Sequence, residues 1–234
     1  MASIEWTPEA IVLFLLVALG AYLLGCVNGA ILTSRLFYRE DVRTHGSGNA
    51  GLTNFYRTYG AKRALYVIGI DMLKAALAVA LGVWLFGPDA VIGRYYAAFF
   101  CILGHLFPVF YHFKGGKGIL CSGMLLLLLD WRIALTGWGI FILLWALTRY
   151  VSLGSVCAAF SFPITSALVY RDEWLWGGIV ALSAAMAALV IWAHRSNIKR
   201  LLTGTESKFQ WKHEISEQPS ITSGKNNKRD GAVS

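Results

Sequence analysis

The stretch Ile11–Val27, which reads IVLFLLVALGAYLLGCV, contains no charged residue. Two similar runs follow at Leu65–Phe86 and Leu175–Ala193. A helix of about 20 apolar residues spans a bilayer. Of the 234 residues, 56% are hydrophobic and only 15% are charged, whereas about a quarter of the residues in a soluble domain are charged. The sequence therefore predicts an all-α, polytopic integral membrane protein and excludes a water-soluble globule.

The first apolar segment is expected to remain in the membrane as a helix. Glu5 and Glu9 precede it, and this N-terminal segment has no Lys or Arg. A cleavable secretory signal begins instead with a basic region.

Seven apolar segments are predicted to cross the membrane. They are Ile11–Leu32, Leu65–Phe86, Tyr95–Val109, Ile119–Leu129, Ile133–Leu147, Val156–Val169 and Leu175–Ala193. The fourth is short, and only three residues separate it from the fifth, so a tilted hairpin and a re-entrant pair are both open. Either arrangement leaves the sidedness of the remaining loops unchanged.

The basic residues predict the orientation. With the N-terminus outside, 17 of the 21 Lys and Arg residues fall on one face of the membrane. By the positive-inside rule that face is cytoplasmic, and the C-terminus lies there too. Residues 1–210 are predicted to form a single transmembrane domain. Residues 211–234 are polar and are expected to form a disordered cytoplasmic tail.

The first loop with chemically distinctive residues is His45–Arg57, which reads HGSGNAGLTNFYR. Its glycines let backbone N–H groups converge on an anion, and its Ser, Thr and Asn residues add donors. Gly46–Gly51 also matches the dinucleotide pattern G-x-G-x-x-G. A basic loop precedes it where a strand is required, so we reject a nucleotide site. The loop is interpreted as an anion site, with a flexible membrane loop as the alternative.

The second loop is Gly104–Gly118, which reads GHLFPVFYHFKGGKG. It leads from an apolar helix end into a glycine turn around Lys117, which again suits an anion. It is not a P-loop, because Tyr111 stands where that motif has Gly, and Gly118 replaces the Ser or Thr. The alternative is a positive-inside anchor, which explains the lysines better than the glycines. His105 is interpreted as a packing or hydrogen-bonding residue rather than a base.

The third stretch, His194–Glu206, follows the last apolar segment and reads HRSNIKRLLTGTE. His194 and Asn197 are three residues apart and are expected on one helical face. Its basic residues alone would suit lipid headgroups. A weaker fourth stretch, Arg149–Ser155, places two serines at the same membrane face, although isolated serines are more often helix caps.

Asp71 and Lys74 lie inside the second apolar segment. A lone charge there would cost roughly 2.5–3.5 kcal/mol, so we expect the two to pair. A structural ion pair is favoured over a proton relay.

The four cysteines are interpreted as small buried side chains, because none has a C-x-x-C spacing. They are Cys26, Cys101, Cys121 and Cys157. No cluster calls for a metal, a nucleotide or coenzyme A, so no cofactor is expected. The net charge of +8 follows membrane topology, so a nucleic-acid partner is not expected.

Together, the first three stretches resemble the bacterial membrane family of acyl-phosphate:glycerol-3-phosphate acyltransferases. Gly46–Arg57 resembles G-S-G-N-x-G-x-T-N-x-x-R, Gly104–Gly118 resembles G-H-x-x-P-x-F-x-x-F-x-G-G-K-G, and His194–Glu206 resembles H-R-x-N-I-x-R-L-x-x-G-x-E. The resemblance covers most of residues 10–209. Departures at Leu52, at 120–121 and at 26–28 leave the polar side chains of these motifs unchanged and concern acyl-chain preference and pocket shape.

The resemblance implies transfer of an acyl group from acyl phosphate to the 1-hydroxyl of glycerol 3-phosphate, the first acylation step of phospholipid synthesis, in the bacterial inner membrane. It implies a catalytic group around glycerol 3-phosphate consisting of Ser47, Arg57, Lys117, His194 and Asn197. It implies substrate-binding roles for Gly46, Gly48, Asn49, Thr53, Asn54, His105, Gly115, Gly116, Gly118, Ser152, Ser155 and Arg195. Structural roles are expected for Asp71, Lys74 and Glu206.

The implied chemistry suits these residues. Both substrates are anions, so cations and oriented N–H groups must offset their repulsion. The H-x-x-x-x-D pair of many acyltransferases is absent, but acyl phosphate is already activated, so direct attack by the hydroxyl is expected without a covalent enzyme intermediate. Membrane lipids and a soluble enzyme that makes acyl phosphate are the implied partners. A transporter or channel for an anionic metabolite and a non-catalytic scaffold are the alternatives.

Overall fold

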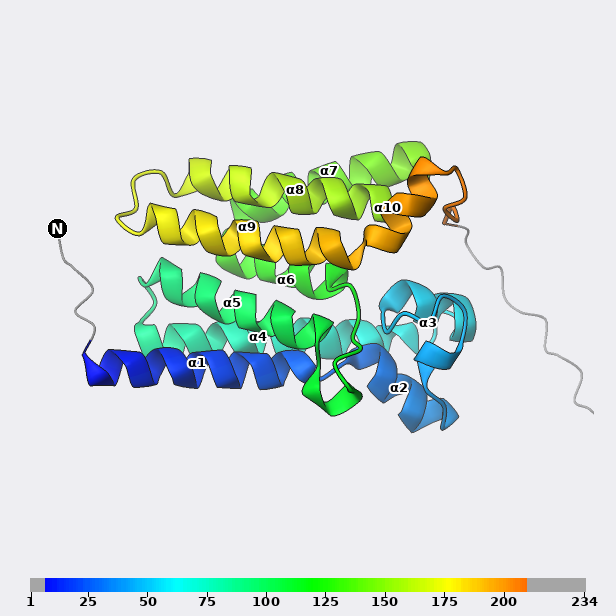
Figure 1. The fold of residues 1–234 in the computed structure, drawn as a ribbon, viewed down its shortest axis with the longest axis horizontal. Coiled ribbons are helices and arrows are strands. Elements are labelled where there is room, and N and C mark those ends of the chain that lie inside the picture. The colour runs from blue at the N-terminus through cyan, green and yellow to red at the C-terminus, as the bar shows by residue number, and fades with distance from the viewer. Residues whose placement is uncertain (1–6, 210–234) are drawn as a thin grey trace, which may run out of the picture.

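The computed structural model describes residues 7–209, and all regular elements in that range are helical (Figure 1). The α-helices are α1 Pro8–Cys26, α2 Gly29–Tyr38, α3 Leu52–Tyr59, α4 Ala64–Phe86, α5 Val91–Leu106, α6 Ile119–Leu129, α7 Trp131–Thr148, α8 Val151–Val169, α9 Trp176–Ala193 and α10 Arg195–Leu202. Two short 3₁₀ turns, η1 Val42–Thr44 and η2 Val109–Tyr111, lie in the loops. The predicted all-α architecture is confirmed. The tail predicted over 211–234 lies outside the described residues.

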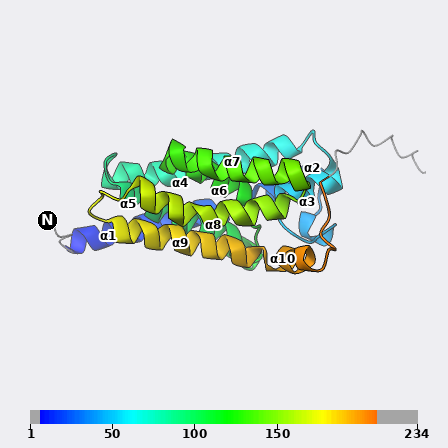
Figure 2. The same ribbon diagram turned by 90° about the horizontal axis from the view of Figure 1, so that it is seen from above.

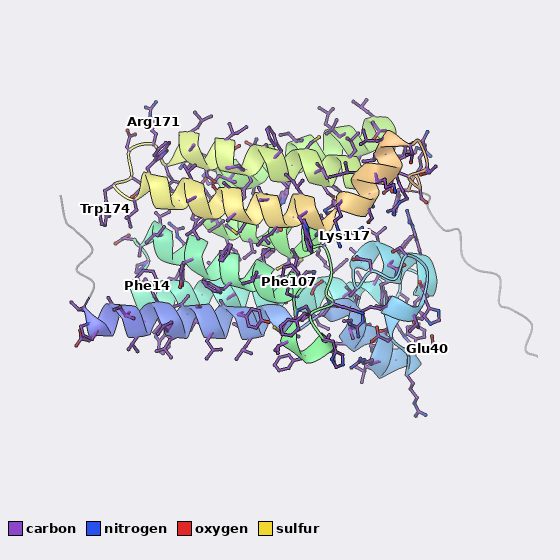
Figure 3. All side chains as sticks on the ribbon, viewed as in Figure 1. Phe14, Glu40, Phe107, Lys117, Arg171 and Trp174 are labelled. Carbon is purple, nitrogen blue, oxygen red and sulfur yellow. The ribbon has the colours of Figure 1, made fainter. Side chains whose placement is uncertain are left out.

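The long helices pack side by side along the longest axis of the molecule, and successive ones run in alternating directions (Figures 1 and 2). The short helices α2, α3 and α10 gather at one end of this bundle (Figure 1). Figure 3 places Glu40 and Lys117 at that end, and Arg171 and Trp174 at the other. The loops that the charge count assigned to one membrane face therefore share one end of the molecule.

Six helical stretches within the described range are long and apolar enough to cross a membrane, by length and composition. They are Pro8–Tyr38, Ala64–Phe86, Val91–Tyr111, Trp131–Thr148, Val151–Val169 and Trp176–Ala193. The predicted fourth crossing forms α6, an apolar helix of only 11 residues. It joins α7 through Asp130 alone, so the pair forms a helical hairpin.

The first predicted crossing, Ile11–Leu32, is wrong as one continuous helix. The α1 helix ends at Cys26, and α2 begins at Gly29. Asn28 separates them because its Oδ1 accepts from the Ile31 amide at 3.0 Å and caps α2. Its Nδ2 donates to the Ala50 carbonyl at 3.1 Å, which ties this break to the first glycine-rich loop.

Several helices begin earlier than the apolar pattern predicted, and the difference is largest for α5 and α8. The α5 helix begins at Val91 instead of Tyr95, and α8 begins at Val151 instead of Val156. Polar residues can occupy a helix end that reaches the bundle's polar loops, so hydropathy alone underestimates helix length. Ser152 and Ser155 therefore lie in the first turns of α8 rather than in a loop.

The ion pair expected in the second apolar segment is present. Lys74 Nζ lies 2.9 Å from Asp71 Oδ1, and both side chains are buried. The Lys74 ammonium also donates to the carbonyls of Gly25 at 3.2 Å and Val27 at 2.7 Å, and Asp71 accepts from the Gly29 amide at 3.1 Å. The pair thus satisfies backbone groups that the break between α1 and α2 leaves without helical partners.

The interface between α1 and α5 depends on small residues. An added Cβ at Gly104 would collide with the Tyr22 carbonyl oxygen, and one at Gly25 would collide with the Cys101 carbonyl oxygen. Glycine is required at both positions because the two backbones approach so closely, as is common between membrane helices.

Three of the four cysteines are buried as predicted, but Cys157 is only half-buried, because its part of α8 lies toward the outside of the bundle. Many large apolar side chains also face outward, including Leu15 at 63% exposure, Leu147 at 73% and Leu168 at 70%. Apolar surface this extensive is typical of contact with lipid.

Gly104→Ala should destabilise the protein by about 1–3 kcal/mol, because the added methyl forces α1 and α5 apart. Gly69→Ala in α4 is the matched control, since its added Cβ has no atom within 4 Å and alanine favours a helix by up to about 1 kcal/mol. Thermal unfolding in detergent, followed by tryptophan fluorescence, measures both. Equal melting temperatures for the two variants would contradict this account of the interface.

Candidate active site

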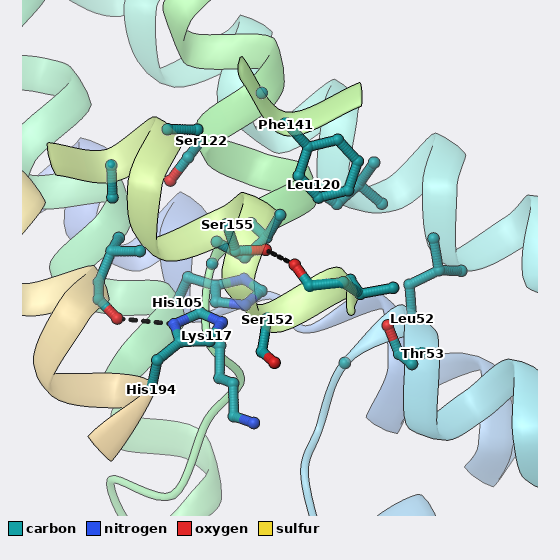
Figure 4. A pocket seen from close by; sticks show the side chains of 18 of the residues that line it. Leu52, Thr53, His105, Lys117, Leu120, Ser122, Phe141, Ser152, Ser155 and His194 are labelled. Carbon is teal, nitrogen blue, oxygen red and sulfur yellow. Dashed lines mark hydrogen bonds between the residues drawn. The ribbon is translucent and has the colours of Figure 1, made fainter. Parts of the chain in front are cut away.

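A cavity of about 790 Å³ opens among α6, α7, α8 and α9 and the loops at the end that carries α3 and α10. One part of its wall is polar and consists of side chains from all three glycine-rich or basic stretches. The other part is an apolar arm between helices, lined by side chains such as Leu125, Phe141, Phe162 and Met186. Figure 4 shows polar and apolar side chains meeting around this space.

Asn54 gives the first loop its shape. Its Nδ2 group donates to the carbonyls of Val42, His45 and Asn49 at 3.0–3.1 Å. Its Oδ1 accepts from the Ser47 amide at 2.9 Å. The Asn54 side chain is therefore hydrogen-bonded within the loop and fixes its turns, and it also lines the cavity.

Three of the loop amides that could bind an anion are occupied within the loop. The Ser47 amide donates to Asn54, the Gly48 amide to the His45 carbonyl at 3.0 Å, and the Gly51 amide to the Asn49 carbonyl at 3.0 Å. Gly46 and Gly48 have positive φ values of 55° and 69°, so these glycines serve the turns. The side chains that line the cavity from this segment and could contact an anion are those of Ser47, Asn49, Thr53 and Arg57.

The second glycine turn is also built for close packing. The Gly115 amide donates to the Leu106 carbonyl at 3.1 Å, and the Gly116 amide donates to the His105 carbonyl at 3.2 Å. A Cβ at Gly115 would collide with the main chain at the end of α5, and one at Gly116 would collide with the Ala50 carbonyl oxygen and the His105 ring. Gly115 and Gly116, both predicted to contact substrate, lie outside the cavity wall, whereas Gly118 and Lys117 line the cavity.

The third stretch bends where the sequence predicted a single helical face. His194 ends α9 and precedes α10, and its Nδ1 lies 2.8 Å from the Val190 carbonyl. Asn197 lies in the first turn of α10. Both side chains still line the cavity, because the bend at His194 turns α10 toward it.

Glu206 connects these segments. Its Oε1 accepts from Asn197 Nδ2 at 2.7 Å and from the Ser152 hydroxyl at 2.7 Å. Its Oε2 accepts from Arg200 Nε at 2.7 Å. Asn197 Oδ1 in turn accepts from Lys117 Nζ, so one hydrogen-bonded network joins the second loop, α8 and α10.

The electrostatics of this network favour an anion. Burial opposes ionisation of Glu206, but hydrogen bonds from Asn197, Ser152 and Arg200 outweigh it and hold the pKa below its usual range. Burial, together with the nearby Arg200 and Arg57 charges, lowers the pKa of Lys117 to about 8, although Glu206 opposes this. Lys117 therefore lies near two further cations, Arg200 and Arg57, and near one carboxylate, Glu206, which leaves an excess of positive charge.

The cavity brings together most of the predicted site residues. These are Gly46, Ser47, Asn49, Thr53, Asn54, Arg57, His105, Lys117, Gly118, Ser152, Ser155, His194, Asn197 and Glu206, together with Asp71. Ser155 donates its hydroxyl to the Val151 carbonyl at 2.8 Å. Gly48 and Lys74 are not in the cavity wall.

Arg195 does not join the predicted site. Its side chain is exposed outside the cavity wall, its guanidinium lies 4.0 Å from the Trp192 ring centroid, and it donates to the Trp192 carbonyl. Arg200 was missed, because sequence reasoning assigned it to lipid headgroups, yet it lines the cavity. Its position three residues after Asn197 could have indicated that both share a face of α10.

Residues 7–209 contain no group of three or more His, Cys, Asp or Glu side chains placed to hold a metal ion. The polar wall instead offers donors and cations, which are groups that bind phosphate. A phosphate-bearing substrate with an apolar tail would fit the two halves of this cavity.

Comparison with known proteins gives a consistent result. The family described as glycerol-3-phosphate acyltransferase matches residues 15–204. The glycerol-3-phosphate acyltransferase of Thermoanaerobacter pseudethanolicus is 40% identical over 200 residues, which cover 86% of this chain and 98% of the relative. That of Brucella anthropi is 43% identical over 188 residues, covering 80% of this chain and 89% of the relative.

Two solved structures also resemble the chain. The glycerol 3-phosphate form of PlsY (YgiH), an integral membrane glycerol 3-phosphate acyltransferase, aligns with a TM-score of 0.73 and 32% identity, covering 84% of this chain and 96% of that one. The form described as containing lysophosphatidic acid aligns with a TM-score of 0.72 and 31% identity, covering 84% of this chain and 95% of that one. This chain is thus a multi-pass membrane acyltransferase that belongs to the glycerol-3-phosphate acyltransferase family.

Proposed function

We propose that this acyltransferase moves a fatty acyl group from acyl phosphate to the 1-hydroxyl of glycerol 3-phosphate, producing lysophosphatidic acid and phosphate. The observation that carries the proposal is the junction of a cation-rich wall with an apolar arm in one cavity. The solved relative with lysophosphatidic acid supports this product.

The donor follows from the charge and the shape of the cavity. Acyl phosphate and glycerol 3-phosphate both carry negative charge, so their approach requires cations in a site of low dielectric constant. Arg57, Lys117 and Arg200 supply that charge. The acyl chain extends into the apolar arm between α6, α7 and α8, where it is shielded from water.

The two main cations suit different tasks. The planar fork of Arg57 can hold two oxygens of one phosphate, whereas Lys117 is a compact charge that suits the transferring group or its neighbouring phosphate. Ser47 and Asn197 add polar contacts to glycerol 3-phosphate. Ser155 lies farther along α8 and contacts the acyl phosphate.

The reaction requires no covalent enzyme intermediate. The C1 oxygen of glycerol 3-phosphate attacks the acyl carbonyl carbon, and the bond from that carbon to the phosphate oxygen breaks. The electron pair of that bond leaves with the phosphate. Hydrogen bonds and cations stabilise the negative charge that develops on the carbonyl oxygen.

The hydroxyl proton goes to a substrate phosphate. Burial lowers the pKa of His194 to about 4 even though its hydrogen bond to Val190 favours the protonated ring. Phosphate monoesters have a pKa of about 6 and are therefore better proton acceptors. His194 donates from Nδ1 to the Val190 carbonyl, so its Nε2 can accept a hydrogen bond from the attacking hydroxyl and orient it.

The proposed membrane placement follows the positive-inside rule. The cation-rich end of the bundle faces the cytoplasm of a bacterial cell, with the N-terminus outside and the C-terminus inside. Glycerol 3-phosphate then enters from the cytoplasm, and a soluble enzyme supplies acyl phosphate at the same face.

The direct test uses purified full-length protein in detergent with palmitoyl phosphate. Phosphate release should require glycerol 3-phosphate, and palmitoyl-coenzyme A should not replace the donor. Arg57→Ala should lower kcat/KM by roughly 10- to 100-fold, because hydrogen bonds to charged groups contribute about 1.5–3 kcal/mol. Arg171→Ala is the control, since that arginine is 77% exposed at the opposite end of the bundle.

Failure of the wild-type protein to transfer from palmitoyl phosphate, with folding intact, would contradict the proposed donor. Equal rates for Arg57→Ala and Arg171→Ala would contradict the role of Arg57.

The rate should also fall at high pH. Lys117, with a pKa of about 8, is a cation below that pH and loses its charge above it. We expect kcat/KM for glycerol 3-phosphate to fall about tenfold per pH unit above pH 8. Lys117→Arg should remove this decrease up to about pH 10, because a guanidinium stays charged. Kinetics between pH 6.5 and 10 measure this, and an unchanged profile in Lys117→Arg would exclude Lys117 as the titrating group.

A further inference from the structure

His105 is a buried side chain in the wall of the cavity. It lies near the end of α5, and only 2% of its surface is exposed. One ring nitrogen, Nδ1, lies 2.7 Å from Lys74 Nζ. Figure 4 shows His105 among the side chains around the cavity that also contains Lys117 and His194.

The surroundings of Lys74 determine which ring nitrogen of His105 carries the hydrogen. Lys74 Nζ contacts Asp71 Oδ1 at 2.9 Å and the carbonyls of Val27 and Gly25 at 2.7 and 3.2 Å. A carboxylate and carbonyls only accept hydrogen bonds, so Lys74 is an ammonium whose three hydrogens are shared among these acceptors and His105 Nδ1. An ammonium has no lone pair, and therefore His105 Nδ1 must accept. A neutral ring with an unprotonated Nδ1 carries its hydrogen on Nε2.

The Nε2 side of the ring faces the glycine turn. A Cβ at Gly116 would lie 2.5 Å from His105 Nε2 and 2.5 Å from the Ala50 carbonyl oxygen, so only glycine leaves room there. Among residues 7–209, no side chain or backbone group forms a hydrogen bond with Nε2, and this atom is not completely enclosed by protein atoms. An N–H group that is held away from bulk water without a partner is unfavourable. Such a group on a cavity wall indicates a ligand oxygen as its partner.

We propose that the His105 Nε2–H group donates a hydrogen bond to an oxygen of the acyl-phosphate group, and that Lys74 is a positioning residue that fixes this tautomer. The inference rests on the proposed function. A neutral donor held by the Asp71–Lys74 pair needs no reorientation during the reaction. It can therefore stabilise charge on the carbonyl or phosphate oxygen without adding a fourth cation to the site.

The tautomer is tested without any substrate. Nitrogen NMR of the full-length protein labelled with ¹⁵N-histidine reports the protonation of each ring nitrogen, and His105→Gln identifies the His105 signals among those of five histidines. We expect a protonated Nε2 and an unprotonated Nδ1. The double variant Asp71→Asn/Lys74→Met, which removes the donor without leaving a buried charge, should show a mixture of tautomers. A protonated Nδ1 in the wild type, or an unchanged tautomer in the double variant, would overturn the role of Lys74.

The substrate contact is tested by a pair of variants. His105→Phe removes the donor and should lower kcat by about 10²–10³-fold, the usual effect of losing one donor to a developing oxyanion. His105→Gln retains an amide donor and should recover most of that loss. The KM for glycerol 3-phosphate should change little in either variant, and thermal unfolding checks that both fold.

Equal rates for His105→Phe and His105→Gln would overturn the substrate contact. If the wild type cannot use acyl phosphate at all, the proposed function fails and this contact fails with it. The NMR result is read separately and decides the tautomer in either case.

Discussion

The rest of the site depends on an excess of positive charge that the protein only partly neutralises. Arg57, Lys117 and Arg200 lie around Glu206, whose two oxygens bind side chains from α8 and α10. A single carboxylate holds the network in place, but it cannot balance three cations. The anionic substrates supply the negative charge that balances these cations. The same cations therefore bind the substrates and stabilise the negative charge that develops during the reaction.

A second ionic group, the Asp71–Lys74 pair, lies deeper in the protein and helps to hold the loops that line the site in place. The Asp71–Lys74 pair satisfies backbone groups at the break between α1 and α2, and Asn28 in that break holds the Ala50 carbonyl of the first loop. Glycines at 115 and 116 let the second loop lie against the end of α5. Both loops are thereby fixed to membrane helices, although their side chains face a polar space.

Much of this was predictable from sequence, and the failures have physical reasons. Long apolar runs predict α4 and α9. The glycine-rich and basic stretches at one predicted membrane face predict where the cavity opens. Hydropathy missed the break because the residues that flank Asn28 are apolar, whereas the cap on Ile31 and the contact with Ala50 depend on one polar side chain. The glycines suggested an anion cradle, but glycine also permits close packing, and only the hydrogen bonds of the Gly48 and Gly116 amides distinguish the two. Arg195 and Arg200 look alike in sequence, but their spacing of five residues places them on different faces of α10, and only Arg200 lies in the cavity wall.

The central claim is that charge and position alone bring two anions together for direct acyl transfer. Isotope exchange tests it: purified protein is incubated with palmitoyl phosphate and ³²P-labelled phosphate, without glycerol 3-phosphate. Direct transfer predicts no label in palmitoyl phosphate, while the same preparation turns over once the acceptor is added. Exchange at a rate comparable to turnover would show an acyl-enzyme intermediate and would contradict this account.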